Sequence, residues 1–213
     1  MVALSKQKCQ VPILGDLKYA TKENFLGRPV IGYHPLAREV CMMTCEAAHA
    51  LCEVQNFLLS ESNCGLIIYD SYLPLRAVRD FNTWVHSPIN DDYELERKAL
   101  HFPDLQKEDI AKHGYLALDV SRHCFGNAVD VFLVSKETGT ALDMGTIFDF
   151  FGKRSHVSAS ENEVGKEAFK NRQILINTMK IFGFSVYSEE FWHFDYHKRE
   201  VDEPMDFEIV PGL

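Results

Sequence analysis

The segment that most constrains the fold is the apolar run NAVDVFLVS at residues 127–135, because it carries a carboxylate inside a strand-like sequence. Its Val, Phe and Leu residues favour a buried β-strand, and the sequence ETG that follows marks a turn. Asp130 lies between two valines of this run. Burying such a carboxylate is costly unless it lies on the exposed face, is paired with a cation, or binds a metal. The fold has to supply one of these three environments.

The rest of the chain predicts helices and short strands around this run. Apolar spacing indicates helices over residues 36–59, 76–85 and 166–182, and apolar runs indicate strands over 66–69, 184–187 and 192–196. Residues 2–32 predict irregular structure, and the polar, acidic stretch 88–105 predicts an excursion. No linker, repeat or low-complexity tract divides the chain. We therefore expect one α+β domain over residues 1–213, with helices around a small antiparallel sheet.

The net charge of the chain argues against some classes of binding partner. The 213 residues contain 22 Lys and Arg against 31 Asp and Glu, a formal net charge of −9. Binding to nucleic acid or to an anionic membrane surface needs clustered positive charge, so this balance argues against both. No apolar run approaches the roughly 20 residues that span a bilayer, and the first residues lack a secretory signal. We expect a cytoplasmic protein, or a periplasmic one if a signal has been removed.

The six cysteines contain no CxxC pair. Cys41, Cys45, Ala48 and Cys52 have the spacing of one stripe along a helix. Free cysteines are commonly buried as small apolar residues, so we interpret the stripe as part of the core. A thiolate metal site is the weaker alternative, because no second cluster completes four ligands.

A first polar group surrounds the start of the apolar run and contains Ser121, His123, Gly126 and Asp130. A His from a loop and a carboxylate from the adjoining strand suit Zn²⁺, which takes nitrogen and oxygen ligands at about 2.0–2.2 Å. The alternative is an ordinary half-exposed strand on which Asp130 is solvated.

A second polar group is EEFWHFDYH at residues 189–197. His193 lies between Trp192 and Phe194, where a buried His with one backbone hydrogen bond is the ordinary interpretation, and Glu190 precedes it by three residues. The two groups together supply two His, an Asp and a spare Glu, the set found in catalytic zinc sites. Neither HExxH nor HxxEH occurs, which excludes the zinc sites that those motifs form on a single helix.

The ordered pattern SxHxxGxAxD at 121–130, followed by ExxH at 190–193, resembles the zinc D-alanyl-D-alanine dipeptidases. That family includes the vancomycin-resistance type and is related to the D-Ala-D-Ala carboxypeptidases. The resemblance continues in KYATKENFLGRPVIGY at 18–33, in GLIIYDSYLPLRAV at 65–78, and in shorter marks within 144–156 and at 171–172.

The resemblance implies a role for each matched residue. His123, Asp130 and His193 would hold one zinc ion per chain, on the small antiparallel sheet. Glu190 would act as general base and then as general acid. The substrate pocket would be lined by Tyr19, Ser121 and Asp149.

The implied substrate is the small dipeptide D-alanyl-D-alanine. Asp149 would pair with its free ammonium group, a requirement that restricts an enzyme to dipeptides because longer, uncharged N-acyl chains cannot satisfy the carboxylate.

One position departs from the family. Where the family has an Arg that stabilises the oxyanion of the tetrahedral intermediate, this chain has Leu73. Leu donates no hydrogen bond, and loss of one such donor typically lowers the rate about 10²–10³-fold. Arg76, one helical turn further on, is the candidate catalytic replacement, and Arg79 is a weaker one. The alternative is that Arg76 is only a surface residue.

These observations leave three functions open. The first is the dipeptidase, the second is a D,D-carboxypeptidase or endopeptidase acting on longer peptidoglycan stem peptides, and the third is a zinc-binding protein whose catalysis is weakened by Leu73. Among the other histidines, we expect His156 to brace the pocket loop and His197 not to be a ligand. The expected surface histidines are His34, His49, His86, His101 and His113.

Overall fold

The computed structural model describes residues 1–4, 9–89, 91–197 and 203–212. Within these residues, no helix combines the length and apolar character needed to cross a membrane. The elements in chain order are β1 (Val2–Ala3), β2 (Leu14–Gly15), η2 (Lys18–Ala20), β3 (Met42–Met43), α1 (Cys45–Glu61), β4 (Cys64–Asp70), α2 (Leu75–Val85), α3 (Asp92–His101), α4 (Lys107–Lys112), η3 (Arg122–Phe125), β5 (Ala128–Ser135), η4 (Lys153–Ser155), α5 (Glu161–Val164), α6 (Lys166–Ile181), β6 (Phe184–Tyr187) and β7 (Glu190–Tyr196).

A five-stranded sheet with the order β2-β4-β5-β7-β6 forms the centre of the fold. Its pairs β4–β5, β5–β7 and β6–β7 are antiparallel, whereas β2 joins β4 in parallel. A separate pair, β1 and β3, is also antiparallel. The predicted α+β class is confirmed, and β2 is the exception to the predicted antiparallel sheet.

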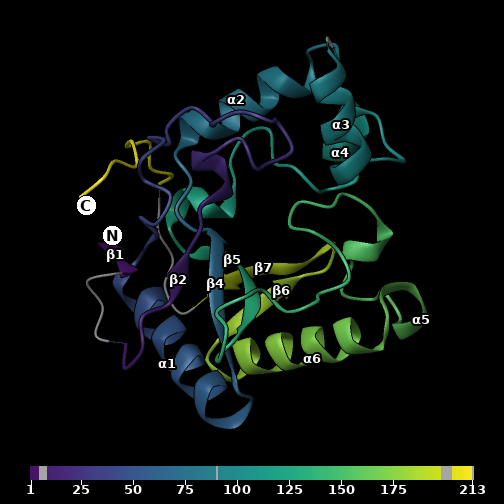
Figure 1. Ribbon diagram of the computed structural model, residues 1–213. Coiled ribbons are helices and arrows are strands. Elements are labelled where there is room, and N and C mark those ends of the chain that lie inside the picture. The colour runs from purple at the N-terminus through teal and green to yellow at the C-terminus, as the bar shows by residue number, and fades with distance from the viewer. Residues whose placement is uncertain (5–8, 90, 198–202, 213) are drawn as a thin grey trace.

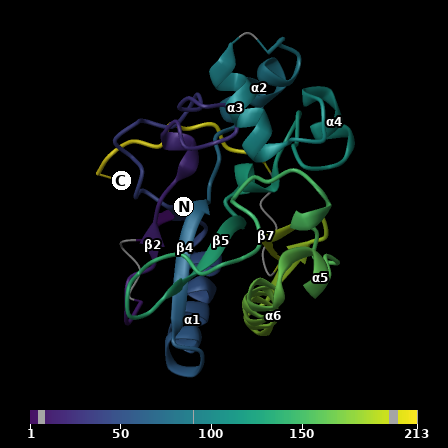
Figure 2. The same ribbon diagram turned by 45° about the vertical axis from the view of Figure 1, so that its right-hand side comes forward.

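The helices form two groups around this sheet. α1 and α6 lie side by side and pack against it, α1 next to β4 and α6 next to β6 (Figure 1). α6 buries Ala168, Leu175 and Met179. α2, α3 and α4 gather at the other end of the molecule (Figure 2).

Two helical predictions differ from the structure. The helix predicted to begin at Leu36 begins at Cys45, because Met42 and Met43 pair with β1 and Thr44 is extended. The stretch predicted as a polar excursion contains α3, which buries only its last residue. α3 starts where the Asp91 carboxylate accepts a hydrogen bond from the Glu94 N–H, a capping interaction that stabilises a helix without an apolar stripe.

The cysteine stripe also differs from its prediction. Cys41 and Ala48 are buried, but Cys45 is exposed. Cys52 is bonded to Cys9, which lies 43 residues earlier in the chain. The helical spacing carried no information about Cys9, because a disulfide partner at that separation is set by the tertiary fold.

We predict that reduction of the Cys9–Cys52 disulfide lowers the stability of the fold. Opening a loop of 43 residues restores chain entropy to the unfolded state and costs about 2–4 kcal/mol. For a chain of this size that corresponds to a Tm lower by roughly 4–16 °C. Calorimetry with and without dithiothreitol measures the change. Cys52→Ser should abolish the response to reductant and Cys45→Ser should keep it; an unchanged wild-type Tm on reduction would contradict the prediction.

Candidate metal centre

Two neighbouring strands place a carboxylate and an imidazole side by side. Asp130 on β5 is the direct partner of His193 on β7 in the antiparallel ladder. Residues paired in this way point to the same face of a sheet, with Cβ atoms about 4.5–5.5 Å apart. Asp130 is only 5% exposed, so the alternative of a solvated carboxylate on a half-exposed strand is wrong.

His123 approaches the same point from the 3-10 helix η3. The Ser121 hydroxyl accepts a hydrogen bond from the His123 N–H at the start of this turn. Gly126 ends it with a φ of 69°, a left-handed conformation that Gly adopts without a steric penalty. The chain then enters β5, which carries Asp130.

The three side chains converge on one point. His123 Nε2 lies 3.1 Å from His193 Nδ1 and 3.4 Å from Asp130 Oδ1, and His193 Nδ1 lies 3.1 Å from Asp130 Oδ1. A tetrahedral ion with bonds of about 2.0–2.1 Å separates its ligand atoms by about 3.3 Å. Asp130 Oδ1 is also buried with no hydrogen-bond partner among the described residues. The three residues therefore fit a zinc ion.

The remaining ring nitrogens are already engaged. His123 Nδ1 donates a hydrogen bond to the Ser71 carbonyl at 2.6 Å and lies 3.4 Å from Asp70 Oδ2. Because a carbonyl only accepts, this contact places the proton on Nδ1 and leaves Nε2 for a metal. His193 Nε2 lies 3.4 Å from Asp195 Oδ1, which leaves its Nδ1. Such outer partners orient metal-binding histidines.

The site favours positive charge at its centre. Burial alone would raise the pKa of Asp130, but the nearby imidazoles of His123 and His193 hold it at about 2. Burial opposes the charged form of His123, yet Asp130 raises its pKa to about 9. Burial likewise opposes the charged form of His193, but the nearby carboxylates of Asp130 and Asp195 raise its pKa well above the usual value. A divalent cation would satisfy the same carboxylates.

Glu190 is the spare carboxylate beside this centre. It is buried at the start of β7, and its Oε2 lies 3.9 Å from His193 Nδ1. Burial raises the pKa of Glu190 to about 8, against the opposing effect of His193. The adjacent Glu189 instead accepts a hydrogen bond from the Ser188 hydroxyl at 2.5 Å and does not line the cavity described next.

A cavity of about 540 Å³ is lined by the three candidate ligands and by Glu190. It is bordered by the sheet and by Phe81 of α2. The three residues expected to contact substrate are brought together here, since Tyr19, Ser121 and Asp149 all line the cavity. The Tyr19 hydroxyl donates a hydrogen bond to Asp149 Oδ2 at 3.0 Å.

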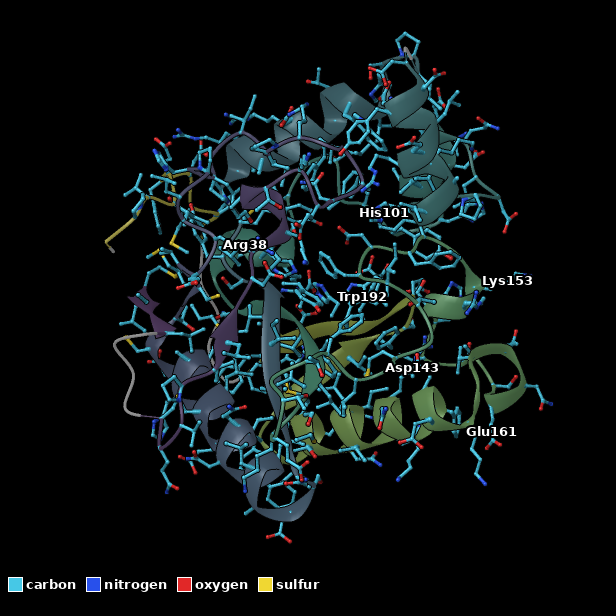
Figure 3. All side chains as sticks on the ribbon, viewed as in Figure 1. Arg38, His101, Asp143, Lys153, Glu161 and Trp192 are labelled. Carbon is cyan, nitrogen blue, oxygen red and sulfur yellow. A yellow bond between two sulfur atoms is a disulfide. The ribbon has the colours of Figure 1, made fainter. Side chains whose placement is uncertain are left out.

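Asp149 is held in an unusual position. Its φ is 57°, a left-handed conformation that is uncommon outside Gly. His101 Nδ1 donates a hydrogen bond to the Asp149 carbonyl at 3.0 Å. His101 is buried, so its prediction as a surface residue is wrong. It is the last residue of α3, and Figure 3 shows it at the end of that helix. Burial, together with the charges of Asp130 and Glu190, raises the pKa of Asp149 well above its usual value.

The structure does not bring Arg76 to the cavity, which corrects its prediction as a catalytic residue. Its Nε donates to Asp206 Oδ1 at 2.9 Å, and its Nη2 donates to the Asp206 carbonyl at 2.7 Å. Arg79 also faces Asp206, at 3.7 Å. Leu73, in contrast, lines the cavity wall. The C-terminal segment that carries Asp206 therefore draws both arginines of α2 away from the site.

Sequence reasoning missed two carboxylates of the site. Asp70 accepts a hydrogen bond from the Tyr33 hydroxyl at 2.6 Å and faces His123, and Asp195 faces His193. The second was detectable, because residues two apart on a strand share a face. His156 Nε2 is hydrogen-bonded to the Tyr115 hydroxyl at 2.6 Å; since Tyr115 lines the cavity, His156 supports its wall as predicted.

Comparison with known proteins identifies the family of this chain. The family model for peptidase M15, D-ala-D-ala dipeptidase, matches residues 8–210. A D-alanyl-D-alanine dipeptidase of Enterococcus faecium is 35% identical over 84% of this chain and 83% of its own length. One of Enterococcus faecalis is 34% identical over 89% and 86%. A solved vancomycin resistance D,D-pentapeptidase in complex with Zn(II) has a TM-score of 0.44 and 16% identity, with 74% of each chain covered. The resemblance seen in the sequence is thereby confirmed, and the chain belongs to the D-Ala-D-Ala dipeptidase family of peptidases.

Proposed function

We propose that this protein hydrolyses D-alanyl-D-alanine to two molecules of D-alanine with one zinc ion per chain. The observation that carries the proposal is the convergence of His123, Asp130 and His193 at separations of 3.1–3.4 Å, with Glu190 beside them in the same cavity. Zinc supplies, when bound, a Lewis acid that lowers the pKa of water and polarises a carbonyl.

Glu190 is placed to move the proton that hydrolysis requires. It accepts a proton from the attacking water, whose oxygen forms a bond to the scissile carbonyl carbon. The carbon–nitrogen bond then breaks, and Glu190 returns the proton to the leaving amine. Its buried position at the cavity wall keeps bulk water from competing for this transfer.

Asp149 supports a dipeptide as the substrate. Among the described residues, the buried Asp149 carboxylate accepts one hydrogen bond, from Tyr19. In a cavity rich in negative charge, such a group is stable as an anion only when a cation pairs with it. The free ammonium group of a dipeptide supplies this cation, whereas the blocked amino end of a longer peptide does not.

The experiment gives the zinc-loaded protein D-Ala-D-Ala or N-acetyl-D-Ala-D-Ala and measures released D-alanine. Leaving a buried charge without its partner costs about 3–5 kcal/mol, so kcat/KM should be about 10²–10⁴-fold lower for the acetylated compound. Asp149→Asn should remove most of this discrimination. Stoichiometric zinc binding without release of D-alanine would contradict the proposed function, and faster cleavage of the acetylated compound would favour the carboxypeptidase alternative.

A further inference from the structure

The cavity has one Arg or Lys among its described lining residues, and this residue is Arg122. It is exposed at the first position of η3, directly before His123. No hydrogen bond or ion pair joins its guanidinium to another described residue, in contrast to Arg28, which binds Asp80, and Arg76, which binds Asp206. Among the described residues, Arg122 is therefore a cation without a partner, and it lines the cavity.

The other charges of the cavity make this cation important for any substrate that carries an anion. Its lining includes five carboxylates, which are Asp70, Asp130, Asp149, Glu190 and Asp195. A free dipeptide is a zwitterion, so Asp149 satisfies only its ammonium end. Its carboxylate would be repelled by the other carboxylates unless a positive group bound it.

Arg122 and Asp149 both line the cavity beside β7. The charge of Glu190, at the first residue of the strand, is among those that raise the pKa of Asp149. Burial raises the pKa of Asp195, but His193, His123 and Arg122 together hold it below its usual value. An extended dipeptide spans at most about 7 Å. A cavity of about 540 Å³ that is lined by both Asp149 and Arg122 can offer an ion pair to each of its ends.

We propose that Arg122 binds the carboxylate of the substrate's C-terminal residue and thereby selects peptides with a free C-terminus. This inference rests on the proposed function, and it assigns a binding partner to the carboxylate end of the dipeptide. An Arg offers two parallel N–H donors that match a carboxylate. The family Arg at the position of Leu73 stabilises the oxyanion, and this task requires hydrogen-bond donors that are fixed in advance. Because no described side chain fixes Arg122, we do not assign that task to it.

The test compares D-Ala-D-Ala with its C-terminal amide in the wild type and in Arg122→Gln. For the free acid, the substitution should raise KM about 10–100-fold and leave kcat nearly unchanged, because an interaction shared by ground and transition states is lost. For the amide, KM should be the same in both proteins. Arg79→Gln is the matched control, since it removes the same charge from an exposed residue that does not line the cavity.

Two outcomes would overturn the assignment. An unchanged KM for the free acid in Arg122→Gln would show that Arg122 does not bind the carboxylate. An equal fall of kcat with both substrates would show that Arg122 acts on the transition state instead.

A binding measurement separates this inference from the proposed function. D-Ala-D-Ala is titrated calorimetrically into zinc-loaded Glu190→Gln, with and without Arg122→Gln. We expect the double variant to bind D-Ala-D-Ala 10–100-fold more weakly, which corresponds to about 1.5–3 kcal/mol for a charged hydrogen bond. This result would support carboxylate binding by Arg122 even if the wild type released no D-alanine. Equal affinities would overturn Arg122 alone, and absence of binding to either variant would contradict both.

Discussion

Glu190→Gln is expected to lower kcat for D-alanyl-D-alanine by about 10²–10⁴-fold while the protein keeps its zinc. The substitution preserves the shape of a residue that is 8% exposed and lines the cavity, but it removes the carboxylate that we propose as the acceptor of the proton of the attacking water. Steady-state kinetics measure the fall in kcat, and metal analysis after dialysis measures the retained zinc.

The neighbouring carboxylate provides the control for this substitution. Glu189→Gln changes the charge by the same amount one residue away, outside the cavity lining, and should leave kcat within a few-fold of the wild type. Loss of zinc from Glu190→Gln would identify Glu190 as a metal ligand and contradict its role as base.

His123→Ala is expected to lower zinc affinity by more than about 100-fold, because loss of an outer partner of a metal-binding His already costs about 10–100-fold. Asp195→Asn changes the partner of His193 Nε2, and it should lower zinc affinity by only about 10–100-fold. Competition with a chelator measures the affinities, and the increase in Tm on adding zinc measures the same difference by linkage.

His197→Ala is the matched control for the proposed metal ligands. His197 lies on the same segment as His193 but is exposed, and its ring is hydrogen-bonded to the Ser185 hydroxyl. Its replacement should leave zinc affinity unchanged. Equal zinc affinity in His123→Ala and His197→Ala would show that the ion binds elsewhere.

The parts of the fold predicted well from sequence are those with a strong local pattern. The α2 helix, the strands β5 and β6, and α6 match their predicted ranges to within one residue, since an apolar face with the right period fixes each of them. α3 was missed because its stability comes from a cap and from polar side chains rather than from such a face.

The residues of the candidate site also differ in how well the local sequence predicts them. His123, Asp130, Glu190 and His193 stand out because polar groups inside apolar strands need a reason to be there. The position of Arg76 followed from no local rule, since Asp206, its partner, lies 130 residues further along the chain. The absence of a partner for the Arg122 guanidinium among the described residues was not predictable for the same reason, because whether a cation is paired depends on side chains that only the tertiary fold assembles.

The register between β5 and β7 has a consequence for how such a protein tolerates insertions and deletions. Asp130 faces His193 only because the two strands are aligned at that one offset. Shifting β7 by a single residue would turn His193 and Asp195 together to the opposite face of the sheet. The turn between β6 and β7, residues 188–189, is therefore a poor place to lengthen or shorten the chain in protein engineering, although it lies on the surface and far in sequence from Asp130.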